Sequence, residues 1–223
     1  TEKSIADQWI LSRLNNTTQE VNLALENFKF NDASLAVYKF IWNEYCDWYI
    51  EFAKSRLQEE GPGKIAAQNV LVHVLEAALK LLHPFMPFIT EEIWQKLPKS
   101  GDSIMVSTFP KCDVANSNAE VENAMSKVME VITGVRNIRG EMNLNPGLKL
   151  NALIKTRHAD LEATLKKHTG FICELARLDQ ITIGPDVEKP KVSASSVLGE
   201  MDLIIPLEGM MDFVEEKSRI EKE

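Results

Sequence analysis

The sequence contains few of the residues that interrupt helices. Its 223 residues include only 10 glycines and 9 prolines, with long stretches between them. Inside a helix, glycine costs about 1 kcal/mol and proline about 3 kcal/mol relative to alanine. Their scarcity therefore favours long helices over short strands joined by turns. We predict a mainly α-helical chain, long enough for one large or two small domains with a buried core.

Cysteines are also few, and long apolar runs are absent. Cys46, Cys112 and Cys173 are far apart, and none belongs to a Cys-x-x-Cys pair. This argues against a disulfide framework and a structural zinc site, and it fits a reducing compartment. No apolar run approaches the roughly 20 residues of a membrane span, and no signal peptide opens the chain. We expect a cytoplasmic monomer without membrane contact.

The sequence lacks every catalytic motif that we considered. It has no glycine-rich phosphate loop and no His-Glu-x-x-His zinc motif, and its four histidines are isolated. The tripeptide at 125–127, Met-Ser-Lys, lies in an amphipathic pattern and is best explained by chance. We therefore predict no catalytic, cofactor-binding or metal-binding residue in this chain.

The overall charge argues weakly against a nucleic-acid partner. Asp and Glu number 33 against 25 Lys and Arg, which gives a net charge of −8. A protein that depends on broad attraction to phosphates is more often basic. Composition alone favours an acidic protein without such a partner, although a local basic patch can still bind phosphates.

Apolar periodicity predicts a helical first half. Apolar residues recur at helical spacing over residues 4–28, and Asn31 and Asp32 are candidate N-caps for a second helix that runs to about Leu57. The Gly-Pro-Gly at 61–63 predicts a loop, followed by a third helix that ends before Pro84. Thr90 is a candidate N-cap for the next helix. Residues 100–117 form an irregular linker, and another helix follows over 119–142.

The pattern changes after Pro146 and Gly147. Strands are predicted over residues 148–154, 181–183, 192–197 and 201–205, with short helices near 160–167 and 171–178. This order indicates a small α+β unit with a mostly antiparallel sheet. Residues 207–223 predict a highly charged helix that needs a partner or a continuation.

Three segments carry a family resemblance: WNEYCDWYIE at 42–51, HPFMPFITEEIW at 83–94 and VRNIRGEMN at 135–143. The second resembles the anticodon-binding helical domain shared by the class I synthetases for valine, isoleucine and leucine. The first and third are similar to the valyl-tRNA synthetases in particular. The ending PLEGMMD at 206–212 resembles the start of their C-terminal coiled-coil arm. The resemblance covers essentially the whole chain.

The resemblance implies a domain plan. Residues 1–117 would be a class I synthetase-type anticodon-binding helical bundle, with the first helix of the family domain missing. Residues 118–206 would be a small α+β domain with a long connecting helix, and 207–223 the root of a truncated coiled-coil arm. The implied partners are tRNA(Val) and the N-terminal catalytic and editing domains of the same enzyme. ATP, with magnesium, would bind in the catalytic domain, which this chain does not contain.

The resemblance also implies where RNA would bind. The C-terminal half of the second helix would face the anticodon, which for valine has a central adenine followed by cytosine. Acidic side chains accept hydrogen bonds from a cytosine amino group, and asparagine pairs with adenine. The candidate residues are Asn43, Asp47, Trp48, Ile50, Glu51 and Lys54. Alternatively, Trp48 belongs to the core, and Asp47 and Glu51 lie on a solvated helix face.

Arg136 and Arg139, one helical turn apart, are two further candidates. They could hold the tRNA backbone, or they could brace the α+β unit against the bundle through carboxylates. An alternative function for the whole chain is a helical-bundle scaffold that docks the catalytic domains without reading RNA. A free-standing enzyme would require an acid/base or metal cluster, which the sequence does not show.

Overall fold

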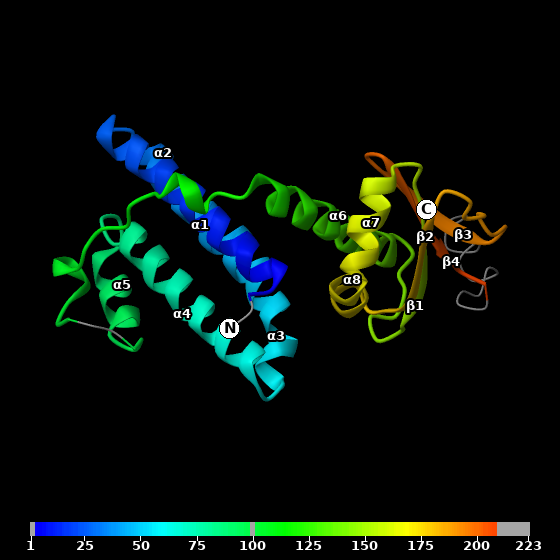
Figure 1. The fold of residues 1–223 in the computed structure, drawn as a ribbon, viewed down its shortest axis with the longest axis horizontal. Coiled ribbons are helices and arrows are strands. Elements are labelled where there is room, and N and C mark those ends of the chain that lie inside the picture. The colour runs from blue at the N-terminus through cyan, green and yellow to red at the C-terminus, as the bar shows by residue number, and fades with distance from the viewer. Residues whose placement is uncertain (1–2, 99–100, 209–223) are drawn as a thin grey trace, which may run out of the picture. The chain divides into compact units, whose positions relative to one another are not determined.

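A computed structural model describes residues 3–98 and 101–208 (Figure 1). The chain divides into two compact units, residues 1–125 and residues 126–223, and each is described by itself. The predicted coiled-coil root at 207–223 lies outside the described residues except for Leu207 and Glu208. The helices of the first unit are α1 (Ile5–Glu26), α2 (Phe30–Lys39), the π-helix η1 (Phe40–Tyr49), α3 (Ile50–Gln58), α4 (Pro62–Leu82) and α5 (Pro87–Trp94).

Helix α1 is closed at both ends by local hydrogen bonds. At its start, the Ser4 hydroxyl accepts from the Asp7 amide, and the Asp7 carboxylate accepts from the Ser4 amide, which is a capping box. At its end, Phe28 adopts a left-handed φ of 57°. The Lys29 amide reaches back to the Ala24 carbonyl at 2.8 Å, the bond of a Schellman motif. The predicted helix over 4–28 is confirmed.

The second predicted helix is continuous from Phe30 to Gln58 but contains an unexpected π-helical segment, η1. Its start differs from the prediction. The Schellman turn leaves Lys29 in the N-cap position, so Asn31 and Asp32 lie inside the first turn and cap nothing. The tight turn after α1, rather than a polar side chain, fixes where α2 begins.

Two prolines set the starts of the next helices. Pro62 and Pro87 each stand in the first turn of their helix, where the missing amide costs nothing. Consequently helix α4 begins at Pro62, within the predicted loop, after Gly61 with a φ of 133°. Thr90 is not an N-cap, because α5 has already begun, and its hydroxyl donates to the Met86 carbonyl at 2.8 Å.

Helix α4 is the central element of the first unit. It contacts α1, α2, α3 and α5, and Figure 1 shows it in teal beside α1. Among the described residues, it is the one helix long and apolar enough to span a membrane by length and composition. Within the bundle, 39% of that apolar stretch is buried. The core of the first unit includes Trp9, Ile10, Phe40, Tyr49, Phe52, Val74 and Leu81.

The segment after α5 is irregular, as predicted, and carries two 3-10 turns, η2 (Ile104–Val106) and η3 (Val114–Asn116). Ile104 closes a small apolar cluster with Leu79 and Trp94. Helix α6 (Ala119–Glu141) follows and confirms the helix predicted over 119–142. The division between the two units falls within α6, after Met125.

The second unit is a four-stranded mixed sheet with helices. Its strands are β1 (Leu150–Lys155), β2 (Leu178–Gly184), β3 (Ser193–Leu198) and β4 (Met201–Pro206), in the order β2-β1-β4-β3. The β1–β2 pair is parallel and the other two pairs are antiparallel, as the sequence led us to expect for most of the sheet. Helices α7 (Ala159–Lys167) and α8 (Thr169–Ala176) form the crossover between β1 and β2.

Helix α6 approaches this sheet closely at Gly134. A Cβ atom there would lie 2.7 Å from Leu198 and 2.9 Å from Leu203. Both leucines belong to the antiparallel β3–β4 pair. A larger residue at this position would therefore force the ends of these two leucine side chains to shift, and glycine lets α6 pack closely on the sheet.

Candidate nucleic-acid interface

The π-helical segment η1 separates a buried face from an exposed one. Its buried residues are Phe40, Tyr45 and Tyr49, at steps of five and four residues. A step of five is one residue wider than an α-helix allows, and it matches the i→i+5 bonding of a π-helix. The exposed positions of the segment are Trp42, Asn43, Cys46 and Asp47. Such widened turns are rare and occur frequently at functional sites.

An exposed pair of aromatic rings lies at the start of this face. Tyr38 and Trp42 stack with ring centroids 6.4 Å apart and planes 5° from parallel. They are 57% and 58% exposed, which is far more than core aromatics show. The exposed surface formed by Tyr38, Trp42, Asn43 and Asp47 is called the ledge below. It offers flat rings beside an amide and a carboxylate.

The sequence-predicted residues divide between the ledge and its surroundings. Asn43 and Asp47 are exposed, so both are available to a ligand. Trp48 is half-buried and stacks on the buried Phe52 with centroids 5.7 Å apart, which makes its ring part of the packing. Ile50 is half-buried. Neither ring of the Trp48–Phe52 stack is a free platform for a base.

Glu51 and Lys54 form an ion pair with each other. The Lys54 Nζ lies 2.5 Å from Glu51 Oε1, and the Lys54 and Glu51 side chains are 57% and 39% exposed. Exposed pairs of this kind contribute little to stability, because water screens them. They can therefore exchange partners at low cost when a phosphate or a base approaches. Tyr38 and Trp42 were not among the predicted site residues, and they are exposed rings on the same helical run as Asn43 and Asp47.

The buried tyrosines on the other face of η1 have raised pKa values. Burial raises the pKa of Tyr45 from 10.0 to about 12. Burial and the hydrogen bond to Asp7 also raise the pKa of Tyr49. In both cases the fold favours the protonated hydroxyl. These hydroxyls therefore act as hydrogen-bond donors throughout the physiological range.

These pKa values predict a loss of stability in alkali. A tyrosine whose folded pKa exceeds its unfolded value stabilises the fold fully below about pH 10, and that contribution is lost as the pH rises through about 12. We expect the free energy of unfolding to fall over this range. All four tryptophans lie at positions 9 to 94, so their fluorescence during denaturant titrations at several pH values reports the first unit. The Tyr45→Phe variant should show a shallower pH dependence, and an identical slope would contradict this assignment.

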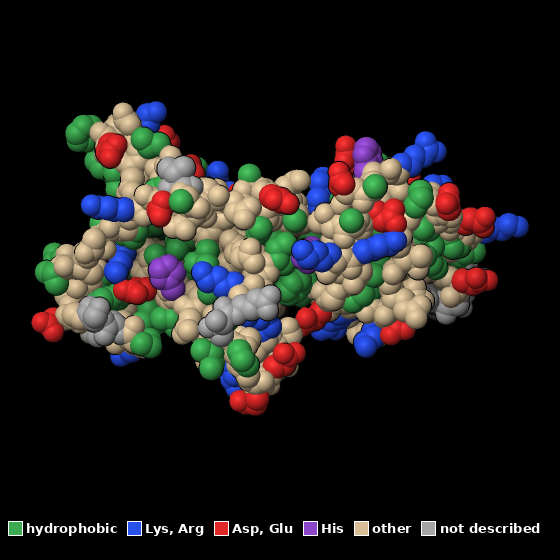
Figure 2. Space-filling view, in the orientation of Figure 1, with side chains coloured by type: hydrophobic (Ala, Val, Ile, Leu, Met, Phe, Trp, Pro, Cys, Tyr) green, Lys and Arg blue, Asp and Glu red, His purple; other side chains and the backbone are tan. Residues whose placement is uncertain are grey.

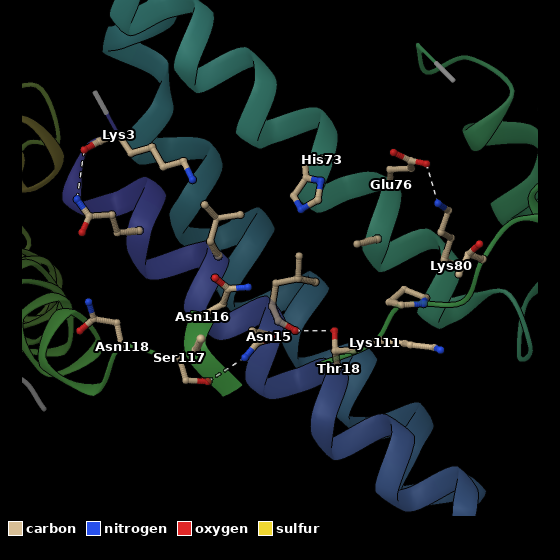
Figure 3. A pocket seen from close by; sticks show the side chains of 17 residues that line it. Lys3, Asn15, Thr18, His73, Glu76, Lys80, Lys111, Asn116, Ser117 and Asn118 are labelled. Carbon is tan, nitrogen blue, oxygen red and sulfur yellow. Dashed lines mark hydrogen bonds and ion pairs between the residues drawn. The ribbon is translucent and has the colours of Figure 1, made fainter. Parts of the chain in front are cut away.

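A second recess in the first unit is less suited to reading bases. A cavity of about 640 Å³ lies between α1, α4 and the η3 loop (Figure 3). Several of its polar groups are already engaged: the Asn15 amide donates to Ser117 at 2.9 Å, the Thr18 hydroxyl donates to a backbone carbonyl, and Lys80 pairs with Glu76. Several polar groups that could recognise a base are thus already hydrogen-bonded in this cavity. In the ledge, by contrast, the side chains of Asn43 and Asp47 are exposed.

On the face shown in Figure 2, charge does not single out a competing surface. Basic and acidic side chains are interspersed over the face shown in Figure 2. This agrees with the net charge of −8. Recognition by this chain would therefore depend on local contacts more than on a broad field.

Comparison with known proteins bears directly on this geometry. Residues 7–154 match the family model described as the anticodon-binding domain of tRNA ligase. The chain belongs to the anticodon-binding domain family of tRNA ligases. The matched range contains all of η1 and also Tyr38 of α2, and therefore the whole ledge.

Individual relatives agree with the family match. The chain is 42% identical over 223 residues to the valine--tRNA ligase of Syntrophotalea carbinolica, 44% to that of Geobacter sulfurreducens and 40% to that of Geobacillus stearothermophilus. These alignments cover 99%, 99% and 100% of the chain but 25% of each relative. The chain thus spans about a quarter of the length of the curated relatives it matches. The resemblance expected from the three sequence segments is confirmed.

In this anticodon-binding domain protein, Arg136 and Arg139 bind backbone carbonyls at the end of α8, and Arg139 also binds one just before β1. Arg139 donates to Leu148 O at 2.8 Å, Ala176 O at 3.2 Å and Arg177 O at 2.7 Å, and Arg136 donates to Leu175 O at 3.2 Å. Basic side chains at a helix C-terminus satisfy its free carbonyls and oppose its dipole. The structure thus places both arginines in a bracing role within the second unit, through carbonyls rather than carboxylates. Contact with RNA by either arginine stays a prediction.

One substitution separates bracing from RNA contact. We expect Arg139→Ala to lower the free energy of unfolding of the second unit by about 1–3 kcal/mol, because three backbone carbonyls lose a charged donor. Binding of RNA to the ledge should not change. Far-UV circular dichroism during denaturation and a titration with tRNA measure the two effects. Reduced affinity in a variant of unchanged stability would instead identify Arg139 as an RNA contact.

Proposed function

We propose that this chain binds the anticodon loop of tRNA(Val), as the C-terminal part of a valine--tRNA ligase that joins valine to its tRNA with ATP. The observation that carries this proposal is the ledge. Proteins that read RNA sequence usually do so on unpaired bases, which stack on aromatic rings and present their edges to polar side chains. The ledge provides stacked, exposed rings next to Asn43 and Asp47.

Each ledge residue has a proposed role. The Tyr38–Trp42 pair offers its outer ring face to an unpaired base. Asn43 carries both a donor and an acceptor, which suits the bidentate pairing of an amide with adenine. The Asp47 carboxylate accepts from the amino group of cytosine. Lys54, which is exposed at the far end of the same helical run, is suited to a phosphate.

The rest of the proposed enzyme lies outside this chain. ATP, with magnesium, is expected to bind in the N-terminal catalytic domain, and we assign none of the residues described here to it. The partners are tRNA(Val) and the catalytic and editing domains of the same polypeptide, in a monomeric cytoplasmic protein. Scaffolding without RNA readout is the alternative, and it predicts no dependence on the anticodon.

A titration with two RNAs tests the proposal. The chain is titrated with tRNA(Val) and with the same tRNA whose second and third anticodon bases are exchanged for others. We expect the exchange to weaken binding at least about tenfold, since each well-placed base contact provides about 1–3 kcal/mol of discrimination. Binding of both RNAs should weaken as salt rises, because phosphate contacts release counterions. Equal affinity for the two RNAs would refute anticodon recognition.

A further inference from the structure

The π-helical segment must be held by contacts outside itself. A run of i→i+5 bonds is rare and usually covers a single turn, yet η1 extends over ten residues. An unusual backbone conformation persists only where the surrounding structure determines it. Three polar contacts connect η1 to other elements, through Glu44, Tyr45 and Tyr49. All three residues lie in the same helical run as the ledge. Two of them stand between Asn43 and Asp47 in the sequence, and Tyr49 follows Asp47.

The contact at the C-terminal end of η1 is buried and charged. The Tyr49 side chain is 0% exposed, and its hydroxyl donates to Asp7 Oδ1 at 2.7 Å. The Asp7 carboxylate is also 0% exposed, and its other oxygen pairs with Arg56. Arg56 in turn donates to Ser4 Oγ and to the Gly63 carbonyl, each at 2.9 Å. The Asp7 carboxylate therefore connects the start of α1, the end of η1 and helix α3, and Arg56 extends this network to the first turn of α4.

Two further contacts hold the middle of the segment. The Tyr45 hydroxyl donates to the Leu71 carbonyl of α4 at 3.1 Å. Arg13 of α1 forms two parallel bonds with the Glu44 carboxylate, at 2.8 and 2.9 Å. Paired bonds of this kind fix orientation as well as distance. The inward residues of η1 are thus anchored to α1 on one side and α4 on the other.

These contacts bear on the ledge because the widened turn sets its geometry. If the widened turn moved by one position along the chain, each residue that it moved past would rotate about the helix axis by about 100°. That angle is the step of a single helical residue. Asp47 lies two positions before Tyr49, so it would move away from Trp42 and Asn43. Tyr45 and Tyr49 each lie two positions from Asp47, and of their two hydrogen bonds the Tyr49–Asp7 bond is the one that joins two fully buried side chains.

We infer that the buried Tyr49–Asp7 hydrogen bond is a positioning contact that fixes the widened turn and thereby sets the discrimination between anticodon bases. Tyr49 touches no RNA in this account, since its ring is fully buried. It acts through the placement of Asp47. The inference rests on the proposed anticodon recognition and adds a residue that determines its specificity.

The Tyr49→Phe variant tests the inference, because it removes one hydroxyl and leaves the ring. We expect the ratio of affinities for tRNA(Val) and its anticodon-exchanged version to fall roughly fivefold to tenfold, a partial loss of one base contact. The salt dependence of binding should stay the same, since the phosphate contacts do not change. The Tyr45→Phe variant, which releases the Leu71 carbonyl from the same face, should lower the ratio in the same direction.

Ile104→Ala is the matched control for stability. Ile104 is 3% exposed in the cluster with Leu79 and Trp94, which includes no residue of η1. This variant should lower stability and leave the affinity ratio unchanged. An unchanged ratio in both tyrosine variants, while the unmodified chain discriminates, would overturn the positioning role and leave the proposed function intact. A chain that does not discriminate before any substitution would overturn both.

Discussion

Replacing Asp7 with alanine is expected to lower the free energy of unfolding of the first unit by about 3–5 kcal/mol. The Asp7 side chain is fully buried, while that of Arg56 is 16% exposed. Removing the carboxylate leaves a largely buried guanidinium without its counter-charge. It also removes the acceptor of the Tyr49 hydroxyl and half of the capping box of α1. Few single substitutions in this chain would break so many contacts at once.

Denaturant titration followed by tryptophan fluorescence measures this loss. The double variant Asp7→Ala with Arg56→Met should recover part of it, because the unpaired charge is then gone as well. Glu92→Ala is the control for a surface ion pair, since Glu92 and Lys96 are 69% and 75% exposed. We expect it to change stability by less than about 0.5 kcal/mol. Comparable effects of Asp7→Ala and Glu92→Ala would show that the buried cluster does not stabilise the bundle.

Replacing Trp42 with alanine is expected to weaken binding of tRNA(Val) by about 1–3 kcal/mol, the usual value of stacking one base on an aromatic ring. This corresponds to a dissociation constant raised from about 5-fold to about 150-fold. The indole is 58% exposed, so its loss removes little buried surface, and the fold should be retained. Trp42→Phe should recover part of the affinity, because it restores an aromatic face.

The control for Trp42 is another exposed ring of the same unit. Phe88, on α5, is 90% exposed and lies outside the ledge. Phe88→Ala should therefore leave the affinity for tRNA unchanged. If Phe88→Ala weakened binding as much as Trp42→Ala did, the RNA surface would extend to α5 and the ledge would not be the primary site.

The sequence predicted the helices of this fold better than their starts. Helical periodicity located α1, α4 and α6 because each carries a long apolar stripe with a clear stop. The starts of α2 and α5 were predicted wrongly at Asn31 and Thr90. A left-handed turn at Phe28 and a proline at Pro87 begin these helices earlier than polar capping residues would. Backbone conformation decided both starts, and side-chain preference alone does not reveal it.

The site was predicted in part for a related reason. Asn43 and Asp47 are exposed, as residues that contact RNA bases must be. Trp48, the ring predicted to stack on a base, packs instead on Phe52, and Trp42 is the exposed tryptophan of this segment. This arrangement belongs to the π-helical segment η1, whose inward residues are Phe40, Tyr45 and Tyr49. The signal was present as the five-residue step from Phe40 to Tyr45, which departs from helical spacing. Sequence could not predict the buried bonds that stabilise this step, because Asp7 and Tyr49 are 42 residues apart.

The most direct measurement places a fluorescent base at the proposed point of contact. A hairpin with the stem and loop of the tRNA(Val) anticodon carries 2-aminopurine in place of the central adenine, and a second hairpin carries it in the stem. Binding of the chain is predicted to quench the loop base, which stacks on the Tyr38–Trp42 pair, and to leave the stem base unchanged. Unaltered emission from the loop base at saturation, or equal quenching by the Trp42→Ala variant, would contradict anticodon recognition on the ledge.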